Sequence, residues 1–196
     1  MRNISLFVED SGHEVLLKAL VQRLADQYEI AVKIRDYSVR GGHGKVLTEL
    51  QQYQRDLQRS QESLPDLIIV GTDTNCKGFL ECKKEIDRAI THFSNWVICA
   101  IPDPHIERWL LLDSAAFKAV LGKGCVMPDQ KCERGRYKQL LLASIRDAGV
   151  TPVLGGIEHA EDLVKAMDLQ RMEQTDDSLG RLLKALHDKF KEWKRV

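Results

Sequence analysis

The chain has 196 residues, of which 43% are hydrophobic and 30% are charged, and its formal net charge at pH 7 is zero. This length suits one domain of ordinary size with a real hydrophobic core. The neutral balance argues against a protein that coats nucleic acid by bulk charge, and no apolar run approaches the roughly 20 residues that span a bilayer. The chain enters a strand at once without a signal-peptide pattern, so we expect a cytoplasmic protein.

Four short apolar runs are expected to form β-strands, and each of them ends close to a carboxylate. The runs lie at residues 4–8, 30–34, 67–70 and 96–101. Helical patterns separate them, and strands joined by helices are typical of a parallel sheet. We therefore predict an α/β fold with a four-stranded, mostly parallel sheet, flanking helices and the common strand order 2-1-3-4.

Apolar residues at helical spacing predict helices between the strands and a helical C-terminal third. The expected helices lie at 12–28, 46–59, 79–93, 104–112, 114–121, 134–148, 157–167 and 177–194. Glycine, proline and cysteine mark an irregular stretch over 122–132. We expect Ser11 to cap the first helix, with Glu14 completing a capping box. The organisation is thus an α/β core over 1–103 and a helical C-terminal extension over 104–196 packed on that core.

Acidic side chains follow the predicted strands. Glu9 follows the first strand and Asp73 follows the third, and these strands are neighbours in the expected order. Ligands of open parallel sheets bind at the carboxyl ends of the strands, and carboxylate oxygens are the ligands that Mg²⁺ prefers. We therefore predict that Glu9 and Asp73 hold Mg²⁺ or Mn²⁺, with Asn75 as a further oxygen ligand. Asp10 and Asp36 are interpreted as capping or turn residues.

Several motifs, taken in order, resemble a known family. The stretch FVEDSG, which contains Glu9 and opens a helix, resembles the first motif of TOPRIM domains, which occur in topoisomerases, primases and OLD-type nucleases. Glu9 matches the glutamate that follows strand one of that family. Residues 73–75 (DTN) match its Asp-x-Asp motif, except that Asn75 replaces the second acid. Residues 40–45 (RGGHGK) and 101–109 (IPDPHIERW), followed by a helical tail, are similar to small stand-alone TOPRIM-like proteins of undefined function.

The resemblance implies a magnesium-dependent nuclease, or nuclease subunit, that hydrolyses phosphodiester bonds of nucleic acid. It implies that Glu9 is a metal ligand or general acid/base and that Asp73 is a metal ligand. Such proteins are often encoded beside an ABC-type ATPase, which implies an ATPase partner and a role in defence against phage. Replacement of the second motif acid by Asn75 removes a charge and weakens the second metal of a two-metal site.

The residues after the fourth strand offer a replacement for the missing acid. Asp103 and Pro104 look like the N-cap and first residue of a helix, which places Glu107 near the same edge of the sheet. Glu107 is therefore a candidate catalytic residue, the alternative being a solvated helix acid. His105 is a candidate phosphate contact in the same crevice, or else an ordinary histidine at a helix start. Trp109 is expected in the core.

A glycine-rich turn precedes the second expected helix. Its glycines, among them Gly42, let backbone N–H groups approach an anion at the positive end of that helix. Arg40, His43 and Lys45 add side chains suited to a phosphodiester. The turn lacks the spacing of a Walker A motif, and it is either a phosphate contact or a flexible turn with incidental basic residues.

The five cysteines are odd in number and contain no CxxC pair. We expect reduced, partly buried thiols rather than a zinc site. A basic cluster over 131–138 contains Tyr137, and it is either a nucleic-acid contact or the solvated face of a helix.

Two other functions stay open from the sequence. The first is a catalytically weak or inactive TOPRIM-like module that binds a ligand or regulates a partner ATPase, which the presence of Asn75 supports. The second is a receiver domain, which needs a fifth strand and a lysine that closes the fourth. The sequence leaves open the choice between DNA and RNA, the oligomeric state and the identity of any partner.

Overall fold

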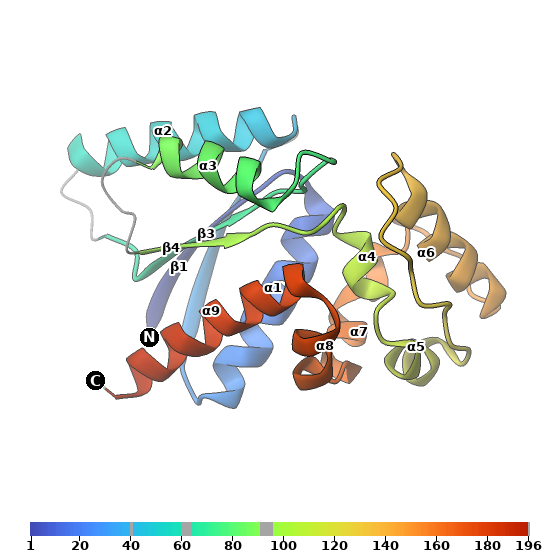
Figure 1. The fold of residues 1–196 in the computed structure, drawn as a ribbon. Helices are drawn as coiled ribbons and strands as arrows, with labels where there is room; N and C mark the ends of the chain where they lie inside the picture. The colour runs from blue at the N-terminus through green and yellow to red at the C-terminus, as the bar shows by residue number, and fades with distance from the viewer. Residues whose placement is uncertain (40, 60–63, 91–95, 196) are drawn as a thin grey trace.

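The computed structural model describes residues 1–39, 41–59, 64–90 and 96–195. These residues form one parallel sheet with the strand order β2-β1-β3-β4 (Figure 1). Its strands are β1 (Arg2–Val8), β2 (Val32–Ser38), β3 (Leu67–Gly71) and β4 (Val97–Ala100). The predicted α/β class, parallel sheet and strand order are therefore confirmed, and no fifth strand of a receiver domain joins this sheet within the described ranges.

The second strand lies further along the chain than expected and includes Asp36. Asp36 is therefore a strand residue and not a turn or capping residue. Its Oδ1 lies 2.6 Å from Nζ of Lys18, which comes from the helix that packs behind the strand. Asp36 therefore forms an ion pair with that helix and is not one of the acids that follow a strand at the carboxyl edge of the sheet.

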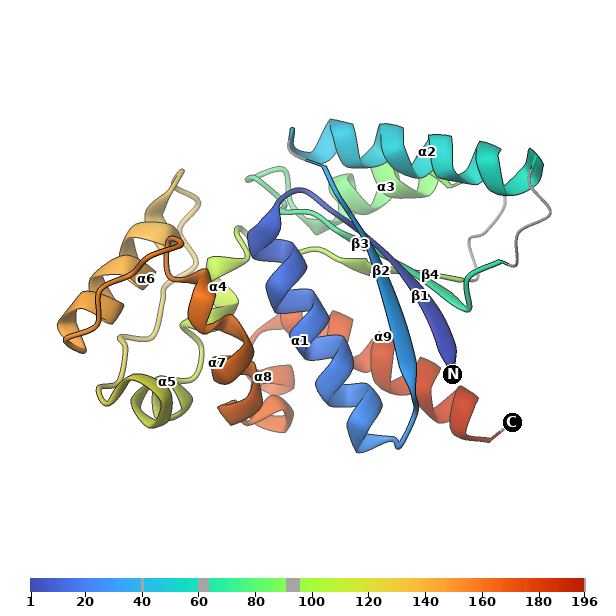
Figure 2. The same cartoon turned by 180° about the vertical axis from the view of Figure 1, so that it is seen from behind.

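Helices cover both faces of the sheet. On one face lie α2 (His43–Arg59) and α3 (Phe79–Ala89), and on the other lie α1 (Ser11–Gln27) and α9 (Asp177–Lys194) (Figure 1, Figure 2). Successive side chains of a strand point to opposite faces, so β1 contributes to both layers. Leu6 and Val8 pack in the hydrophobic cluster that contains α1 and α9, whereas Phe7 packs in the cluster that contains α2 and α3.

The helical C-terminal part continues from the α1 side of the sheet. Its further helices are α4 (Glu107–Leu110), α5 (Ser114–Leu121), α6 (Arg136–Asp147), α7 (Ala160–Ala166) and α8 (Leu169–Thr175), with a 3-10 turn η2 (Ile157–His159) before α7. One hydrophobic cluster runs from β1 and α1 through Trp109 and Leu163 to Phe190. Burial of apolar area therefore joins these helices to the sheet. No helix in the described part of the chain is long and apolar enough to cross a membrane.

Most expected helices are present, with shifted ends. α5 and α9 have the predicted bounds, whereas α3 ends at Ala89, and residues 91–93 of the expected helix lie outside the described residues. The single helix expected over 157–167 is divided into η2 and α7. α8 is missing from the expected elements because its 7 residues are too few to show a helical period.

The first helix is capped one residue earlier than expected. Asp10, not Ser11, is the N-cap of α1, because its Oδ1 accepts a hydrogen bond from the backbone N–H of His13 (3.0 Å). Glu14 accepts a hydrogen bond from Lys18 (2.8 Å) and does not complete a capping box. Aspartate caps helices as well as serine does, so the choice between neighbouring residues depends on the direction in which the chain leaves β1.

The helix expected to start at Asp103 and Pro104 starts later. α4 begins only at Glu107, and Asp103 Oδ1 accepts a hydrogen bond from Thr74 Oγ1 (2.9 Å) instead of capping a helix. The prediction for Asp103 was therefore wrong, since this carboxylate joins the loop after β4 to the loop after β3. Trp109 is 1% exposed, which confirms its place in the core.

Two cysteines form a disulfide that the sequence did not predict. Cys76 follows β3, and Cys132 lies in the irregular stretch before α6, with their Cα atoms 5.7 Å apart at a sequence separation of 56. The expectation of free thiols is therefore wrong for this pair, because the fold brings together two loops that are distant in the chain. Cys82, Cys99 and Cys125 are free thiols.

A buried polar network, which we call the anchor cluster, fixes the start of α9 against α4. The cluster consists of Arg108, Trp109, Asp176 and Ser178. The guanidinium of Arg108 and the hydroxyl of Ser178 both donate to the carboxylate of Asp176, which also accepts from the backbone N–H of Leu179 (2.8 Å) as the N-cap of α9. Trp109 Nε1 donates to Ser178 Oγ (2.8 Å). The Arg108 guanidinium thus pairs with the Asp176 carboxylate, and neighbouring groups donate further hydrogen bonds to that carboxylate.

Candidate active site

The candidate site lies at the carboxyl edge of β1 and β3. The register pairs Val8 with Gly71, so that the next residues of the two chains, Glu9 and Thr72, come to lie opposite each other. Thr72 Oγ1 donates a hydrogen bond to Glu9 Oε1, and Asp73 follows directly. Glu9 is only 9% exposed. The adjacency of Glu9 and Asp73 that the strand order predicts is thus present in the structure.

Asp73 lies between two imidazoles. His13 Nε2 donates to Asp73 Oδ1 (3.0 Å), and His105 Nδ1 donates to Asp73 Oδ2 (3.0 Å). The other ring nitrogen of His13 donates to Asp10 Oδ1 (2.9 Å). Since ionised carboxylates only accept hydrogen bonds, both nitrogens of His13 carry a proton, and its ring is a cation. His13 is therefore a cation between Asp10 and Asp73, and His105 is the next hydrogen-bonded group of this chain.

The pKa values follow from this chain. Burial disfavours the charged form of His13, but Asp73 and Asp10 outweigh burial and raise the pKa of His13 to about 10. The hydrogen bond from His13 lowers the pKa of Asp10 to about 2. Burial acts to raise the pKa of Asp73, yet His13 and His105 hold it below its ordinary value. The hydrogen bond with Asp73 raises the pKa of His105.

A second chain of polar contacts, which ends in an ion-pair contact, leads from Glu9 toward the surface. His43 Nδ1 donates to Thr72 Oγ1 (2.7 Å), and His43 Nε2 lies 2.6 Å from Glu85 Oε2 of α3. Lys77 Nζ also donates a hydrogen bond to Glu85 Oε1 (3.3 Å). The glycine-rich segment therefore orients His43 toward Thr72, and Thr72 donates a hydrogen bond to Glu9. This position differs from the phosphate contact expected of His43.

Excess negative charge distinguishes this edge. We call the following residues the edge cluster: Glu9, Asp10, His13, Asp73, His105 and Glu107. Burial raises the pKa of Glu9, against the hydrogen bond from Thr72, and the charge of Asp73 acts in the same direction as burial. Burial likewise raises the pKa of Glu107, and the charge of Asp73 adds to it. Glu107 therefore belongs to the same electrostatic environment as Asp73, as its predicted place near this edge requires.

The remaining predicted residues lie around the edge cluster or outside it. Asn75 is exposed, and within the described residues its side chain makes no hydrogen bond to Glu9 or Asp73. Lys45 is exposed in the first turn of α2, and Gly42 has a left-handed φ of 75° just before that helix. Arg40 lies outside the described residues.

The donor chemistry of the edge cluster fits a hard divalent cation, because Glu9, Asp73 and Glu107 all offer carboxylate oxygens. Both oxygens of Asp73 accept hydrogen bonds from imidazoles. In the part of the chain that the structure describes, no three Asp, Glu, His or Cys side chains are grouped closely enough to coordinate an ion without rearrangement. The type of ligand therefore suits Mg²⁺ or Mn²⁺.

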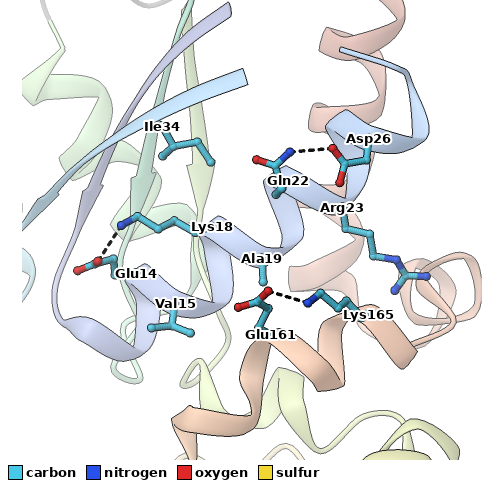
Figure 3. Close-up of a pocket in the computed structure, with 10 residues that line it drawn as sticks. All are labelled: Glu14, Val15, Lys18, Ala19, Gln22, Arg23, Asp26, Ile34, Glu161 and Lys165. Carbon is cyan, nitrogen blue, oxygen red and sulfur yellow. Dashed lines mark hydrogen bonds and ion pairs between the residues drawn. The ribbon is translucent and has the colours of Figure 1, made fainter. Parts of the chain in front are cut away.

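A separate groove of about 650 Å³ runs along α1 between β2 and α7 (Figure 3). It is lined by Glu14, Val15, Lys18, Ala19, Gln22, Arg23, Asp26, Ile34, Glu161 and Lys165. Its charged side chains pair with each other, as Lys18 does with Glu14 (2.8 Å) and Lys165 with Glu161 (2.7 Å). Arg23 donates to the carbonyl of Met167 at the end of α7 (2.7 Å). Most charged side chains of the groove are therefore paired, whereas the edge cluster has more carboxylates than cations.

Sequence analysis missed three residues of the site, namely His13, Thr72 and Glu85. His13 stands four residues after Glu9 and three after the capping Asp10, which is the spacing of neighbours at a helix start. This spacing is the one signal by which His13 could have been found. Thr72 and Glu85 join the site through long-range contacts with Glu9 and His43 that no local pattern encodes.

The fold and the edge cluster define a class of protein, namely a parallel α/β protein with acids and histidines at the carboxyl edge of adjacent central strands. A family model described as "Domain of unknown function (DUF4276)" matches residues 8–187. The chain therefore belongs to the DUF4276 family. No curated protein and no solved structure matches the chain.

Proposed function

We propose that this protein is a divalent-metal-dependent phosphodiesterase of the TOPRIM-like type, a nuclease or nuclease subunit that acts on nucleic acid. The observation that carries the proposal is the gathering of Glu9, Asp73 and Glu107 at one edge of the sheet. Burial raises the pKa of both glutamates, and the charge of Asp73 raises each further. Acids that are held together against their own repulsion favour the binding of a cation.

In this proposal Glu9 and Asp73 hold Mg²⁺ or Mn²⁺, and Asn75 is a further oxygen ligand. When bound, such an ion neutralises charge on the phosphoryl group and lowers the pKa of a coordinated water. The raised pKa of Glu9 lets its carboxylate exchange a proton nearer to neutral pH than an exposed glutamate can. Glu107, whose pKa is also raised, is the second candidate for proton transfer.

The surroundings of the edge cluster supply contacts for a phosphodiester. The positive end of α2 lies beside it, with Gly42 before the helix and Lys45 in its first turn. His43 is hydrogen-bonded to Thr72, which donates to Glu9, so it acts on the edge cluster through Thr72 and not as a direct phosphate contact. His105 stands on the opposite side of Asp73. Arg40 stays a predicted phosphate contact from the sequence alone.

Partners and location form part of the same proposal. The resemblance to stand-alone TOPRIM-like proteins supports an ABC-type ATPase partner and a role in defence against phage. A neutral chain fits a subunit whose grip on DNA or RNA comes in part from another protein. We place the protein in the cytoplasm, where its nucleic-acid substrate and the ATPase would both be present.

One observation favours a second function, a module that regulates or binds without efficient chemistry. Asn75 replaces the second motif acid and is exposed. Both oxygens of Asp73 are already engaged by His13 and His105. If these hydrogen bonds persist in the presence of metal, the edge cluster is a closed network that carries no bound ion.

A calorimetric titration and a cleavage assay on the same samples test the proposal. The full chain is titrated with Mn²⁺ and then incubated with single- and double-stranded DNA and RNA. We expect metal binding and cleavage in the wild type. Glu9→Gln should lose most metal affinity, and its cleavage rate should fall by at least about 100-fold.

Asp36→Asn is the matched control, because Asp36 is an acid of the same sheet that pairs with Lys18 and lies outside the edge cluster. This variant should bind Mn²⁺ and cleave like the wild type. Equal metal binding by wild type and Glu9→Gln contradicts the proposed ligand. A wild type that neither binds Mn²⁺ nor cleaves any of the four substrates supports the regulatory module instead.

A further inference from the structure

The disulfide between Cys76 and Cys132 joins the candidate site to the helical part of the molecule. Cys76 lies three residues after Asp73, in the loop that follows β3. Cys132 ends a short segment, residues 129–132, which we call the strap. Both cysteines are exposed, so a thiol in solution can reach either sulfur. Exposed disulfides of this kind are the labile and regulatory ones.

The strap has a second attachment on the opposite side, to α4 and α6. Arg108 Nε donates to the carbonyl of Asp129 (2.9 Å). The hydroxyl of Tyr137 lies 3.0 Å from the same carbonyl and 2.7 Å from that of Lys131. Arg136 pairs with the Asp129 side chain (2.7 Å). The strap is thus held by α4 and α6 at Asp129 and Lys131 and by the disulfide at Cys132.

His105 lies beside the residue that binds the strap. Its ring centroid is 6.3 Å from that of Tyr137, the buried residue that binds the strap. While Nδ1 of His105 donates to Asp73, its Nε2 is buried and has no hydrogen-bond partner among the described residues. Burying an imidazole nitrogen without a hydrogen-bond partner costs free energy. Exposure of that nitrogen to water removes this cost.

There is room for movement beside the strap. A cavity of about 250 Å³ has Gln130 of the strap in its lining, together with Asp103 and Pro104, the two residues before His105. On the other side of the disulfide, Asn75 and Cys76 hold left-handed φ values of 45° and 71°. Such values are unfavourable for residues other than glycine, so the loop gains conformational freedom when the cross-link is removed.

We propose that Cys76 and Cys132 are a redox modification site, whose disulfide holds the strap over His105 and whose reduction by a dithiol uncovers that imidazole. A thiolate of the dithiol attacks one sulfur, and the bond between Cys76 and Cys132 breaks to leave a mixed disulfide and one cysteine thiol. The second thiol of the reductant then releases the other cysteine. Two electrons and two protons pass to the protein, and the dithiol becomes a cyclic disulfide.

The three free cysteines are not expected to take part in thiol–disulfide exchange. Burial raises the pKa of Cys99 and that of Cys125 to about 11, and it also raises the pKa of Cys82. Thiols with such values stay protonated and are poor nucleophiles near neutral pH.

The test measures exposure of His105 and not activity, so its outcome is independent of the proposed function. Oxidised full-length protein and protein reduced with dithiothreitol, then freed of it under nitrogen, are treated with diethylpyrocarbonate at one pH. Peptide mass spectrometry follows the modification rate of His105. We expect reduction to raise that rate by at least about fivefold. His187 is the internal control, since it is bonded to Tyr28 (2.9 Å) far along α9, and its rate should not change.

A thiol count on denatured samples shows that reduction occurred, since it should rise from three to five. The double variant Cys76→Ser, Cys132→Ser should show the fast rate with or without dithiothreitol. Hydrogen exchange of the peptide over 125–135 gives a second readout in the wild type, which does not depend on folding of the variant. An unchanged His105 rate at five thiols, or a disulfide that survives excess dithiothreitol in the native protein, overturns the proposal.

Discussion

Two buried ionic networks in this protein differ in how completely their charges are matched. In the anchor cluster one cation, Arg108, meets one anion, Asp176, and neighbouring donors satisfy the remaining oxygen positions. In the edge cluster four carboxylates share two imidazoles. Burial and repulsion there raise the pKa of Glu9 and Glu107, whereas no comparable surplus exists at the anchor.

The difference separates a structural ion pair from a site. A matched pair fixes the position of two elements and has no remaining capacity to bind a ligand. A cluster with surplus charge can bind a cation, exchange protons or do both. Both networks contain buried charged residues and many hydrogen bonds, so burial alone would not have distinguished them. The balance of positive and negative charges in each network does.

The largest effect on stability is expected at the anchor cluster. Arg108→Met removes the cation and leaves Asp176 as a buried charge without its partner, which should lower the free energy of unfolding by about 4 kcal/mol. Urea denaturation measures this change. Adding Asp176→Asn should recover part of the loss, because it removes the unpaired charge and asparagine still caps α9. A double variant no more stable than Arg108→Met would show that charge pairing is not what the anchor provides.

A smaller and pH-dependent effect is expected at His13. Its pKa is raised from 6.5 to about 10 on folding, so its stabilising contribution is complete below pH 6.5 and is lost as the pH rises through about 10. His13→Gln should therefore lower the free energy of unfolding by about 3 kcal/mol near pH 6, with a shrinking difference toward pH 10. Urea midpoints across this range measure it.

His187→Gln is the control with the opposite sign. Burial lowers the pKa of His187, so its neutral form favours folding, and its contribution grows as the pH rises. The two variants should thus diverge in opposite directions from the wild type along the pH axis. Parallel profiles for both would show that His13 is not a stabilising cation between Asp10 and Asp73.

The smallest effect is a gain, at Glu9. A carboxyl whose pKa is raised on folding destabilises the folded state when it is ionised, so Glu9→Gln should stabilise the protein at pH 7 by roughly 1 kcal/mol. The gain should vanish well below pH 4.5, where the wild-type residue is protonated in both states. Glu161→Gln, which breaks an exposed pair with Lys165, should change stability by no more than about 0.5 kcal/mol. A loss at Glu9→Gln would mean that its ionised form is favoured by the fold.

Much of the fold could be predicted because its signals are local. The aliphatic runs of β1 and β3 and the apolar stripe of α9 have the period of their elements, and the strand order follows a common topology. That topology alone brings Glu9 and Asp73 to one edge. α8 and the late start of α4 were missed because a short helix has no detectable period, and because Asp103 bonds to Thr74 across the sheet edge.

The detailed site could not be predicted because tertiary contacts form it. His13 looks like any polar residue of a first helical turn until α1 is placed against the loop that holds Asp73. Thr72 and Glu85 meet Glu9 and His43 only after β3 and α3 have packed. The bond between Cys76 and Cys132 depends on the path of the irregular stretch before α6, which has no periodic signal.

The packing of α9 against β4 and α1 has a consequence for biosynthesis. A ribosome completes all four strands and α1 well before it makes α9, so one apolar face of the sheet stays open while the intervening helices emerge. During that interval the nascent chain exposes the surface that chaperones recognise and that promotes aggregation. The yield of protein in cells is therefore expected to depend on the rate of translation and chaperone supply as well as on the stability of the finished fold.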